Sequence, residues 1–501
     1  MSRSFKFVFI GLISICSVGL FAQGYEADIL RFSFNNYAGS ARYVALGGAF
    51  SSIGADLSNF SHNPAGVGMY RNSIAQFSGG VNFVNNRSTY LGNEETDFKL
   101  NPSIPSLGVV FATNKPSKNG MFRGATVGFA FNRLGEYNSS EKITALNTTP
   151  RSSISWNWAN EMSDVYNGQF INETSVDQVS FNTYTGYYGF LANYDSSLLD
   201  YTSPVLDSVQ QTRYVDSKGG KNEMVLALGT NYLDKLFIGA SVGIPLINYS
   251  RESRFIEEDA AISDINTFFN EFELKEDYKT EGLGFNFKLG ALYKVNRWVR
   301  IGGAFHTPER ISFTERYSSN LTSDMDFDDF DIESGEGVFQ YRVRLPWKAN
   351  VGASLFFKEK GFLSLDYEAI GFNAMRYTFE NDFRELSDDI NTNLKAKYKV
   401  SHSVRVGIEG VIKKFRIRGG YYYADSPIRK QFQVEGFNYS RHTISGGFGF
   451  MLDKVAVDFA YQHNVNRQFE QPYTVSNANV SGINRNTTQG LGIVTFSYKL
   501  R

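Results

Sequence analysis

The sequence of 501 residues predicts an all-β fold, a transmembrane antiparallel β-barrel of about 14 strands with an N-terminal hatch, or plug, inside the barrel. Apolar residues recur at every second position from residue 72 onward, which is the period of strands with two unlike faces. Short turns alternate with long polar connections along the same region. The composition agrees, because 46 glycines, 29 tyrosines and 44 phenylalanines accompany only 11 prolines.

The alternation is clear near the C-terminus, where Val494 and Phe496 flank Thr495. A soluble β-sandwich would show the same period, so alternation alone does not distinguish an aqueous protein from a membrane protein. The connections make the distinction. Tight turns such as 233–235 and 413–414 alternate with polar connections of about 15 to 85 residues, which is typical of outer-membrane barrels.

The predicted strands share this pattern, number about 14, and lie near 73–85, 104–113, 124–136, 222–232, 236–250, 281–293, 298–316, 341–357, 362–379, 400–412, 415–424, 438–452, 455–467 and 488–500. An even number places both ends of the sheet on the periplasmic side. The last strand can then close on the first, so that every backbone group is paired as lipid requires.

Residues 1–22 predict a secretory signal peptide, with Arg3 and Lys6 before an apolar run and Ala22 before the cleavage site. The single cysteine, Cys16, lies within it, so disulfides and thiol chemistry are excluded in the exported chain. A net charge of −1 gives no reason to expect a nucleic-acid partner. The mean hydropathy of −0.29, without a second long apolar run, excludes membrane-spanning helices.

Residues 23–71 predict the hatch, and residues 72–501 the barrel with its long outer loops. Small residues dominate between Ser40 and Tyr70, so a short helix could press closely against its neighbours. This helix should end at Asn63, Pro64, Ala65 and Gly66, because proline fixes its own φ and glycine tolerates a positive φ. The alternative is an ordinary corner between a helix and a strand.

Charged residues recur at predicted lumen positions of neighbouring strands, including Arg405, Arg416 and Arg418 opposite Asp366 and Glu368. One interpretation is a set of cross-strand ion pairs in a polar lumen. The other is that one of the three arginines binds a carboxylate head group through its forked donors. None of the five histidines has the spacing of a metal site, so neither a metal nor another cofactor is expected.

The longest connection, between Arg133 and Asn222, is rich in tryptophan, tyrosine and phenylalanine. So many aromatic residues favour a folded, partly apolar outer cap over an unstructured loop. The connection between Arg251 and Thr280 is predicted as a second outer loop.

Several segments, taken in order, resemble the FadL/TodX family of outer-membrane transporters. They are the hatch turn at residues 63–66, the segment from Gly302 to Glu309 (GGAFHTPE), Leu345-Pro346 with Gly352, and Arg405-Val406-Gly407. The resemblance implies a 14-stranded barrel with an N-terminal hatch, no catalytic residues, and uptake of long-chain fatty acids or aromatic hydrocarbons across a Gram-negative outer membrane. It also implies a monomer with two kinds of partner, a hydrophobic ligand and outer-membrane lipid.

Release in this family is thought to go sideways through a kink in the third strand. Here the segment from Asn132 to Gly135 interrupts the alternation and is the candidate for that kink. The alternative is a plain strand end that happens to contain glycine.

The sequence therefore favours passive uptake of an apolar small molecule over enzymatic activity, because a plugged barrel suits a lipid-like cargo better than an open pore does. Two other classes of function stay open. One is a surface receptor or adhesin, for example for haem, with the barrel as its anchor. The other is an outer-membrane hydrolase, which would need a nucleophile beside a lumen histidine.

Overall fold

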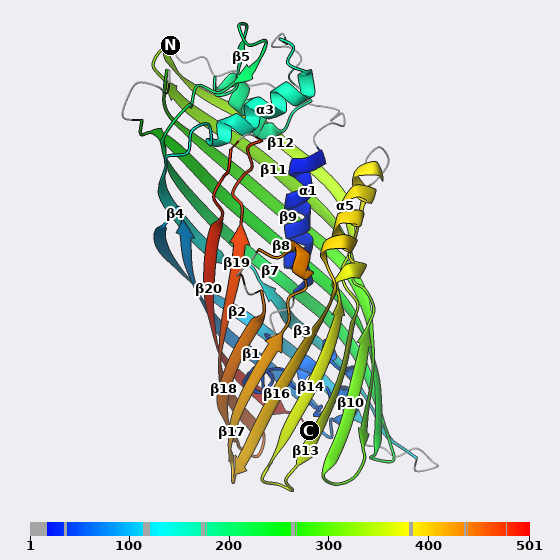
Figure 1. Ribbon diagram of the computed structural model, residues 1–501. Helices are drawn as coiled ribbons and strands as arrows, with labels where there is room; N and C mark the ends of the chain where they lie inside the picture. The colour runs from blue at the N-terminus through cyan, green and yellow to red at the C-terminus, as the bar shows by residue number, and fades with distance from the viewer. Residues whose placement is uncertain are drawn as a thin grey trace.

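The fold is a closed antiparallel β-barrel with a folded N-terminal segment in its lumen (Figure 1). The computed structural model describes residues 18–34, 38–113, 121–171, 176, 178–261, 266, 268–379, 384–434, 437, 439–476 and 478–500. β1 (Ile74–Tyr90) pairs with β2 (Asn93–Thr113) along one edge and with β20 (Ile483–Lys499) along the other, so the sheet closes on itself. The predicted all-β, 14-strand barrel is confirmed. Across these residues, no helix is both long and apolar enough to cross a membrane.

The remaining wall and cap strands are β3 (Phe122–Glu136), β4 (Ser139–Asn147), β5 (Asn193–Asp195), β6 (Asp200–Thr202), β7 (Val209–Tyr232), β8 (Leu236–Asp259), β9 (Phe269–Lys294), β10 (Val299–His306), β11 (Arg310–Met325), β12 (Asp328–Arg344), β13 (Lys348–Phe356), β14 (Gly361–Gly371), β15 (Arg376–Phe379), β16 (Val400–Ile412), β17 (Phe415–Ala424), β18 (Arg441–Met451) and β19 (Val455–Glu470). The helices are α1 (Val18–Ser33), α2 (Ala41–Ala45), α3 (Ile154–Tyr166), α4 (Phe181–Tyr188) and α5 (Arg384–Lys397), with 3-10 turns η1 (Leu57–Phe60), η2 (Pro64–Met69), η4 (Phe372–Ala374) and η6 (Lys430–Phe432).

Some positions in the barrel wall are built from two strand segments in line. β10 and β11 both pair with β9, and the strand that they form is interrupted between them at Pro308. β12 and β13 are likewise separated at Pro346, and β14 and β15 by η4. Proline lacks the N–H that a strand ladder needs, so each proline marks an interruption rather than an extra strand. β3 and β4 form a fourth such position, because both pair with β7, and β5 and β6 form a separate two-stranded sheet. The labelled segments therefore reduce to 14 strands.

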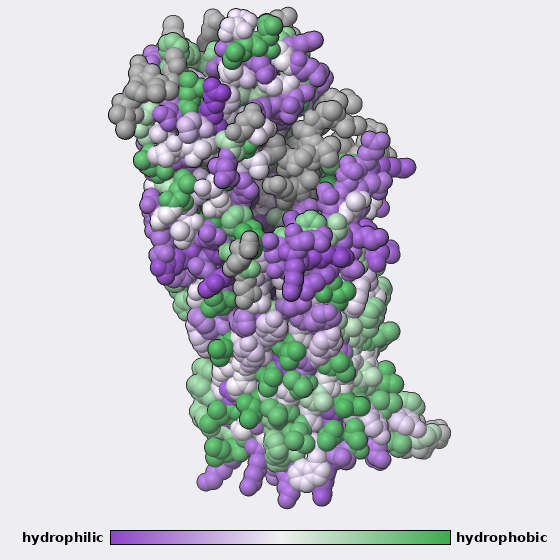
Figure 2. Space-filling model, viewed as in Figure 1, coloured by the Kyte–Doolittle hydropathy of each residue, from purple (hydrophilic) through white to green (hydrophobic). Residues whose placement is uncertain are grey.

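The lower part of the barrel carries the lipid-facing surface (Figure 2). The outward side chains of β8 are apolar from Ile238 through Val242 to Leu246, and polar from Asn248 upward. Such a band of about ten residues matches one tilted membrane crossing. The predicted outer loop at residues 251–280 is wrong, because β8 and β9 continue as paired strands to Glu258 and Glu271, well above this band.

The hatch occupies the lower lumen but is less helical than predicted. α2 has only five residues, because Gly47 and Gly48 follow it with φ of 63° and 74°. The chain then forms η1 and η2, whose residues are nearly all buried against the wall. The N-terminal cap residues Ser40 and Asp56 share a hydrogen bond of 2.6 Å, which ties α2 to η1.

Helices fill the upper part of the barrel. α1 stands in the upper lumen beside α5 and the long strands β8 to β11, and α3 and α4 cover the outer end (Figure 1). The cap has its own apolar core, which includes Trp158, Met162 and Phe272. The predicted folded cap is therefore confirmed for the described residues.

Residues 1–17 of the predicted signal peptide lie outside the described residues, and the predicted cleavage site before Gln23 falls within α1.

Candidate functional site

The hatch turn is organised by the side chain of Asn63. Its Oδ1 accepts a hydrogen bond from the Ala65 backbone N–H at 3.1 Å, and its Nδ2 donates to the Ser51 carbonyl at 2.6 Å. Pro64 takes the first position of η2, where its fixed φ suits a helical turn. The expected positive φ at Gly66 is wrong. Gly66 is needed for space instead, because a Cβ there would overlap the Asn59 side chain and approach Gly54.

Glycines of the barrel wall form the seat of the hatch. A Cβ at Gly239 of β8 would overlap the Pro64 carbonyl, and one at Gly229 of β7 would overlap the Gly68 nitrogen. The same holds for Gly302 against Ser51. Because glycine lets two backbones approach directly, these positions hold the hatch against the wall without side chains in between. The alternation of apolar residues gives no sign of this seat.

Asn132 and Gly135 lie where β3 leaves β2. Pairing between β2 and β3 ends at Ser106 and Asn132, and the register of β3 with β7 shifts between Arg133 and Gly135. Gly135 is buried, with little room for a Cβ beside Tyr137. The segment predicted as a kink thus coincides with a β-bulge, which bends a strand.

The other side of this bend is an unpaired strand edge. In the described part of the chain, no strand pairs with the free edge of β2 between Asn93 and Pro105. Pro102 and Pro105 lie in this stretch, where a missing N–H costs no ladder hydrogen bond. The wall therefore has a lateral discontinuity between β2 and β3.

Above the hatch, the lumen holds an aromatic chamber that contains two side chains of α1. Ile29 and Phe32 are almost fully buried in it. Phe32 stacks on Phe313 with ring centroids 5.1 Å apart and makes edge contacts with Tyr137 and Tyr249. The chamber is completed by apolar residues of β12, β15 and α5, namely Tyr341, Val343, Tyr377, Ile390 and Leu394. Its contents are apolar side chains of the protein itself.

Two carboxyl groups meet at the edge of the chamber. Tyr278 Oη lies 2.6 Å from Asp28 of α1 and 3.0 Å from Glu315 of β11, and Tyr341 donates to Glu315 at 2.9 Å. Glu315 pairs with Thr280, above the apolar band that ends at Leu283 on β9, so it lies outside the membrane-spanning part. Burial, assisted by the negative charge of Asp28, raises the pKa of Glu315 to about 7.

The arginines predicted to bind a head group lie lower, at the level of the hatch. Arg405 pairs with Glu368 at 2.5 Å, and Arg418 bridges Glu409 and Asp458, both at 2.6 Å. These contacts are cross-strand ion pairs. Arg416 makes no such ion pair among the described residues, and its Nη1 is buried there without a hydrogen-bond partner.

A buried lysine that the sequence did not single out lies between the hatch and the chamber. Lys348 is 5% exposed and lines an enclosed space of about 20 Å³ together with His62, Asn132 and Glu368. That volume holds about one water molecule, which is too small for any ligand in the closed state. A ligand could reach Lys348 only after the hatch moves.

Ser51 and His62 come within hydrogen-bond distance, 3.1 Å, in the hatch. Ser51 Oγ donates to Asn350 Oδ1 at 3.0 Å, so His62 Nε2 must carry the proton in its contact with Ser51. Asp366 approaches the same nitrogen at 3.6 Å. A general base needs a bare nitrogen facing the nucleophile and an acid on the other, so this arrangement does not activate Ser51. Nor do the described residues group three metal-binding side chains at any one place.

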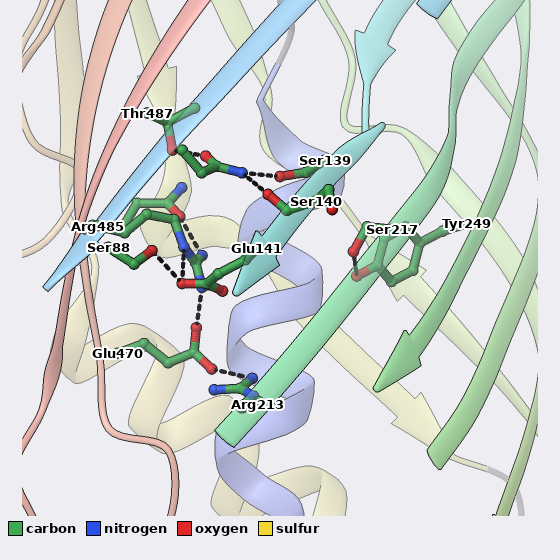
Figure 3. A network of polar contacts seen from close by, with 12 residues as sticks. Ser88, Ser139, Ser140, Glu141, Arg213, Ser217, Tyr249, Glu470, Arg485 and Thr487 are labelled. Atoms are coloured by element: carbon green, nitrogen blue, oxygen red, sulfur yellow. Dashed lines mark hydrogen bonds and ion pairs between the residues drawn. The ribbon is translucent and has the colours of Figure 1, made fainter. Parts of the chain in front are cut away.

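A polar network spans the lumen beneath the cap (Figure 3). Arg485 of β20 contacts Glu141 of β4 at 2.8 Å and Glu470 of β19 at 2.8 Å. Ser88 of β1 donates to Glu141 at 2.7 Å, and Arg213 of β7 donates to Glu470 at 2.7 Å. These bonds hold β4 on the inner side of β1, so the chain beyond the β3 bend lies inside the barrel.

Comparison with solved structures shows the same fold in outer-membrane channels. The chain is similar to a Pseudomonas aeruginosa FadL homologue, with 11% identity, a TM-score of 0.55, and coverage of 94% of this chain and 100% of that one. For the Pseudomonas putida toluene transporter TodX the values are 12%, 0.52, 93% and 100%. For the CymD monoaromatic hydrocarbon channel they are 11%, 0.50, 93% and 99%.

A comparison with curated proteins returned no match. The family model described as outer membrane protein transport protein (OMPP1/FadL/TodX) matches residues 223–498, which is more than half of the chain. That match begins in β7 and ends in β20, so it includes the strands that seat η2 and most of the wall. The chain belongs to the OMPP1/FadL/TodX family of outer-membrane transport proteins.

Proposed function

We propose that this protein takes up hydrophobic small molecules, long-chain fatty acids or aromatic hydrocarbons, by passive passage through the plugged barrel. The observation that carries the proposal is the aromatic chamber above the hatch, which α1 fills with Ile29 and Phe32. A chamber that buries these side chains in the closed state can bury an apolar ligand in their place. Each buried methylene contributes about 0.8 kcal/mol. Similarity to TodX and CymD, which are described as carriers of toluene and monoaromatic hydrocarbons, supports the substrate class.

Exposed aromatic side chains at the outer tip suit the first contact with such a ligand. Phe190, Phe268 and Phe327 are 42%, 56% and 56% exposed, and the ring of Phe327 lies 5.5 Å from that of Phe190. Phe190 and Phe268 both adopt positive φ, 58° and 65°, which is a costly conformation for a bulky residue. An apolar patch whose aromatic side chains are kept exposed in this way can collect apolar molecules from the medium.

From the chamber, the ligand would leave through the discontinuity between β2 and β3. The bend at Asn132 and Gly135 and the unpaired edge of β2 favour this route, because the ligand can enter lipid there without opening a strand ladder. For a fatty acid, the carboxylate would bind Lys348 or Arg416 once the hatch moves. The paired Arg405 and Arg418 are poorer candidates, since binding there would first have to break a buried ion pair.

The test is uptake into proteoliposomes that contain the purified protein, with radiolabelled oleate and toluene as separate probes. We expect faster uptake of at least one probe than into protein-free vesicles, and a loss of uptake in Phe313→Asp, which places a charge in the chamber. Phe170→Asp is the matched control, because Phe170 is exposed in the cap and belongs neither to the chamber nor to the exposed patch. Uptake equal to that of protein-free vesicles for both probes would overturn the proposal. Lipid extraction and mass spectrometry of the purified protein would identify a co-purified ligand.

A further inference from the structure

A broad groove runs across the outer face of the wall, on the lower part of β17, β18, β19, β20 and β1. Its volume is about 1000 Å³, and its lining is almost entirely apolar. Its floor follows one row of paired residues. Gly446 of β18 pairs with Tyr461 of β19, which pairs with Gly492 of β20, which pairs with Val81 of β1.

The groove is hollow because glycines occupy outward positions in its floor. A Cβ at Gly492 would meet no atom within 4 Å, and one at Gly446 would meet only the Arg418 carbonyl at 3.8 Å. Neither glycine is needed for a positive φ. These positions therefore leave open a space that the protein could have filled with side chains at no steric cost.

Stacked phenylalanines form the wall of the groove on its periplasmic side. Phe448 lies between Phe415 and Phe459, with ring centroids 6.1 Å and 4.9 Å apart and ring planes within 26° and 22°. All three line the groove. Rigid aromatic faces beside a glycine floor form a channel for a flexible apolar chain, because little side-chain entropy is lost on contact.

The groove has the length and the surroundings for an acyl chain. From β17 to β1 there are four strand spacings, which amounts to about 19 Å. Its outward neighbours, such as Ile417, Phe448 and Phe496, belong to the lipid-facing surface, where no water is available to fill a hollow. Acyl chains of the surrounding bilayer are the molecules present at this depth.

The periplasmic end of the groove is basic. Phe415 follows directly on the turn Lys413-Lys414, and Lys454 lies in the neighbouring turn between β18 and β19. The backbone of Lys414 bonds to Met451 at 2.9 Å, so the two turns are adjacent. Lysine ammonium groups at the membrane surface attract anionic lipid head groups.

We propose that this groove binds an anionic phospholipid of the periplasmic leaflet, with one acyl chain over Gly446 and Gly492 and the phosphate beside Lys414 and Lys454. The site is separate from the lumen, so it does not depend on the proposed uptake function. A lipid held there would cover the strands adjoining β2 on the side away from the discontinuity.

Native mass spectrometry of the full barrel, released from nanodiscs of dioleoyl phosphatidylglycerol or dioleoyl phosphatidylcholine, tests the proposal. Gly446→Leu combined with Gly492→Leu fills the groove, and we expect about one fewer lipid retained per barrel in both membranes. Lys414→Gln combined with Lys454→Gln should lower retention of phosphatidylglycerol only. Gly410→Leu is the matched control, since Gly410 also faces outward with nothing within 4 Å of a Cβ but lies outside the groove.

Correct folding of each variant is checked by heat-modifiable gel migration. Retention unchanged by the glycine double variant, with normal folding, would overturn the proposal. A second measurement tests the proposal if the glycine double variant does not fold. Spin-labelled phosphatidylglycerol in nanodiscs with the unaltered barrel should show an immobilised component, and that component should be lost in the single variant Gly492→Leu. Equal immobilisation in the single variant would also overturn the proposal.

Discussion

Asn132 of β3 donates a hydrogen bond from Nδ2 to Ser61 Oγ in the hatch, over 2.9 Å. The same amide lies 3.3 Å from the Leu57 carbonyl and accepts from Ser106 of β2 at 2.8 Å. One side chain therefore joins the hatch, the bend of β3 and the last paired residue of β2. If the hatch moves, either these hydrogen bonds break or the bend of β3 moves with the hatch. The hatch is therefore coupled to the discontinuity between β2 and β3.

Replacing Asn132 should loosen this connection. Asn132→Ala leaves the Ser106 and Ser61 hydroxyls and the Leu57 carbonyl without their partner, at a local cost of about 1–3 kcal/mol. We expect faster hydrogen exchange at residues 57–61 and entry of small hydrophilic dyes that the unaltered barrel excludes. Asn270→Ala, which removes an exposed bond to Asp324, is the control and should change neither readout. Unaltered exchange at 57–61 would show that the hatch is held without Asn132.

The glycine seat makes a sharper prediction about the plug. Gly239→Ala forces a methyl group into the Pro64 carbonyl, whereas Gly410→Ala places the same methyl group in open space. We expect Gly239→Ala to insert normally but to show open-channel events in single-channel recordings, because displacing the hatch relieves the clash. Gly410→Ala should remain closed. If Gly239→Ala also remains closed, the hatch contact is adjustable and does not seal the barrel.

The hatch turn itself should respond to bulk at Gly66. Gly66→Ala would bring a methyl group into Asn59 and toward Gly54, although its φ is accessible to alanine. The expected result is a lower threshold for opening, seen as increased sensitivity of cells to bulky antibiotics. Pro64→Gly should act in the same direction more weakly, by about 0.4–1 kcal/mol, since it only frees one backbone angle. Equal antibiotic sensitivity of the Gly66→Ala and unaltered proteins would contradict this account.

Phe32 is the residue of α1 whose removal should favour ligand binding. Phe32→Ala empties the space between Phe313, Tyr137 and Tyr249 and removes a buried side chain worth about 3–5 kcal/mol to the docking of α1. We expect tighter binding of a fluorescent naphthyl probe and faster proteolysis of the N-terminal segment. The control is Phe170→Ala, an exposed change in the cap. Weaker binding of the probe would mean that Phe32 forms part of the ligand site.

The wall was predictable from the sequence because lipid imposes a simple rule on it. Outward residues such as Ile238, Val242 and Ile244 must be apolar, so strand positions and their even number follow from alternation and turns. Above the membrane, outward residues no longer need to be apolar. Lys275, Asp277 and Lys279 face water, and the residues between them, Glu276 and Tyr278, are also polar, so the upper halves of β8 and β9 look like loops in the sequence.

The chamber and the seat could not be predicted for a different reason. Phe32 meets Phe313 and Tyr249 only through tertiary packing over more than 200 residues, and no local period encodes that contact. Wall glycines such as Gly239 look the same in sequence as the outward Gly492, yet one touches the hatch and the other faces lipid. At residues 63–66 the sequence indicated a turn but not its cause, because the Asn63 side chain caps the start of η2 and Gly66 has no positive φ.

Docking of α1 should weaken as pH rises toward neutrality. Glu315 has a pKa of about 7 while buried beside Asp28, against about 4.5 in water. Below pH 4.5 the carboxyl is protonated whether α1 is docked or not, so docking is strongest there. Between about pH 4.5 and 7 the solvated carboxyl of the undocked form ionises first, which lowers the docking free energy by up to about 3 kcal/mol; above pH 7 the loss is complete.

The measurement is hydrogen exchange at residues 26–33, corrected for the intrinsic effect of pH on exchange. Protection should fall between pH 5 and pH 8 in the unaltered protein. Glu315→Gln keeps an acceptor for Tyr278 and Tyr341 but cannot ionise, so its protection should not change over this range. Tyr317, which bonds to Asn182 outside the Glu315 contacts, provides the control variant Tyr317→Phe, in which the pH dependence should persist. If protection falls equally in Glu315→Gln, the pH dependence belongs to another group. The other carboxyl at this edge of the chamber, Asp28, is still present in that variant and would be that group.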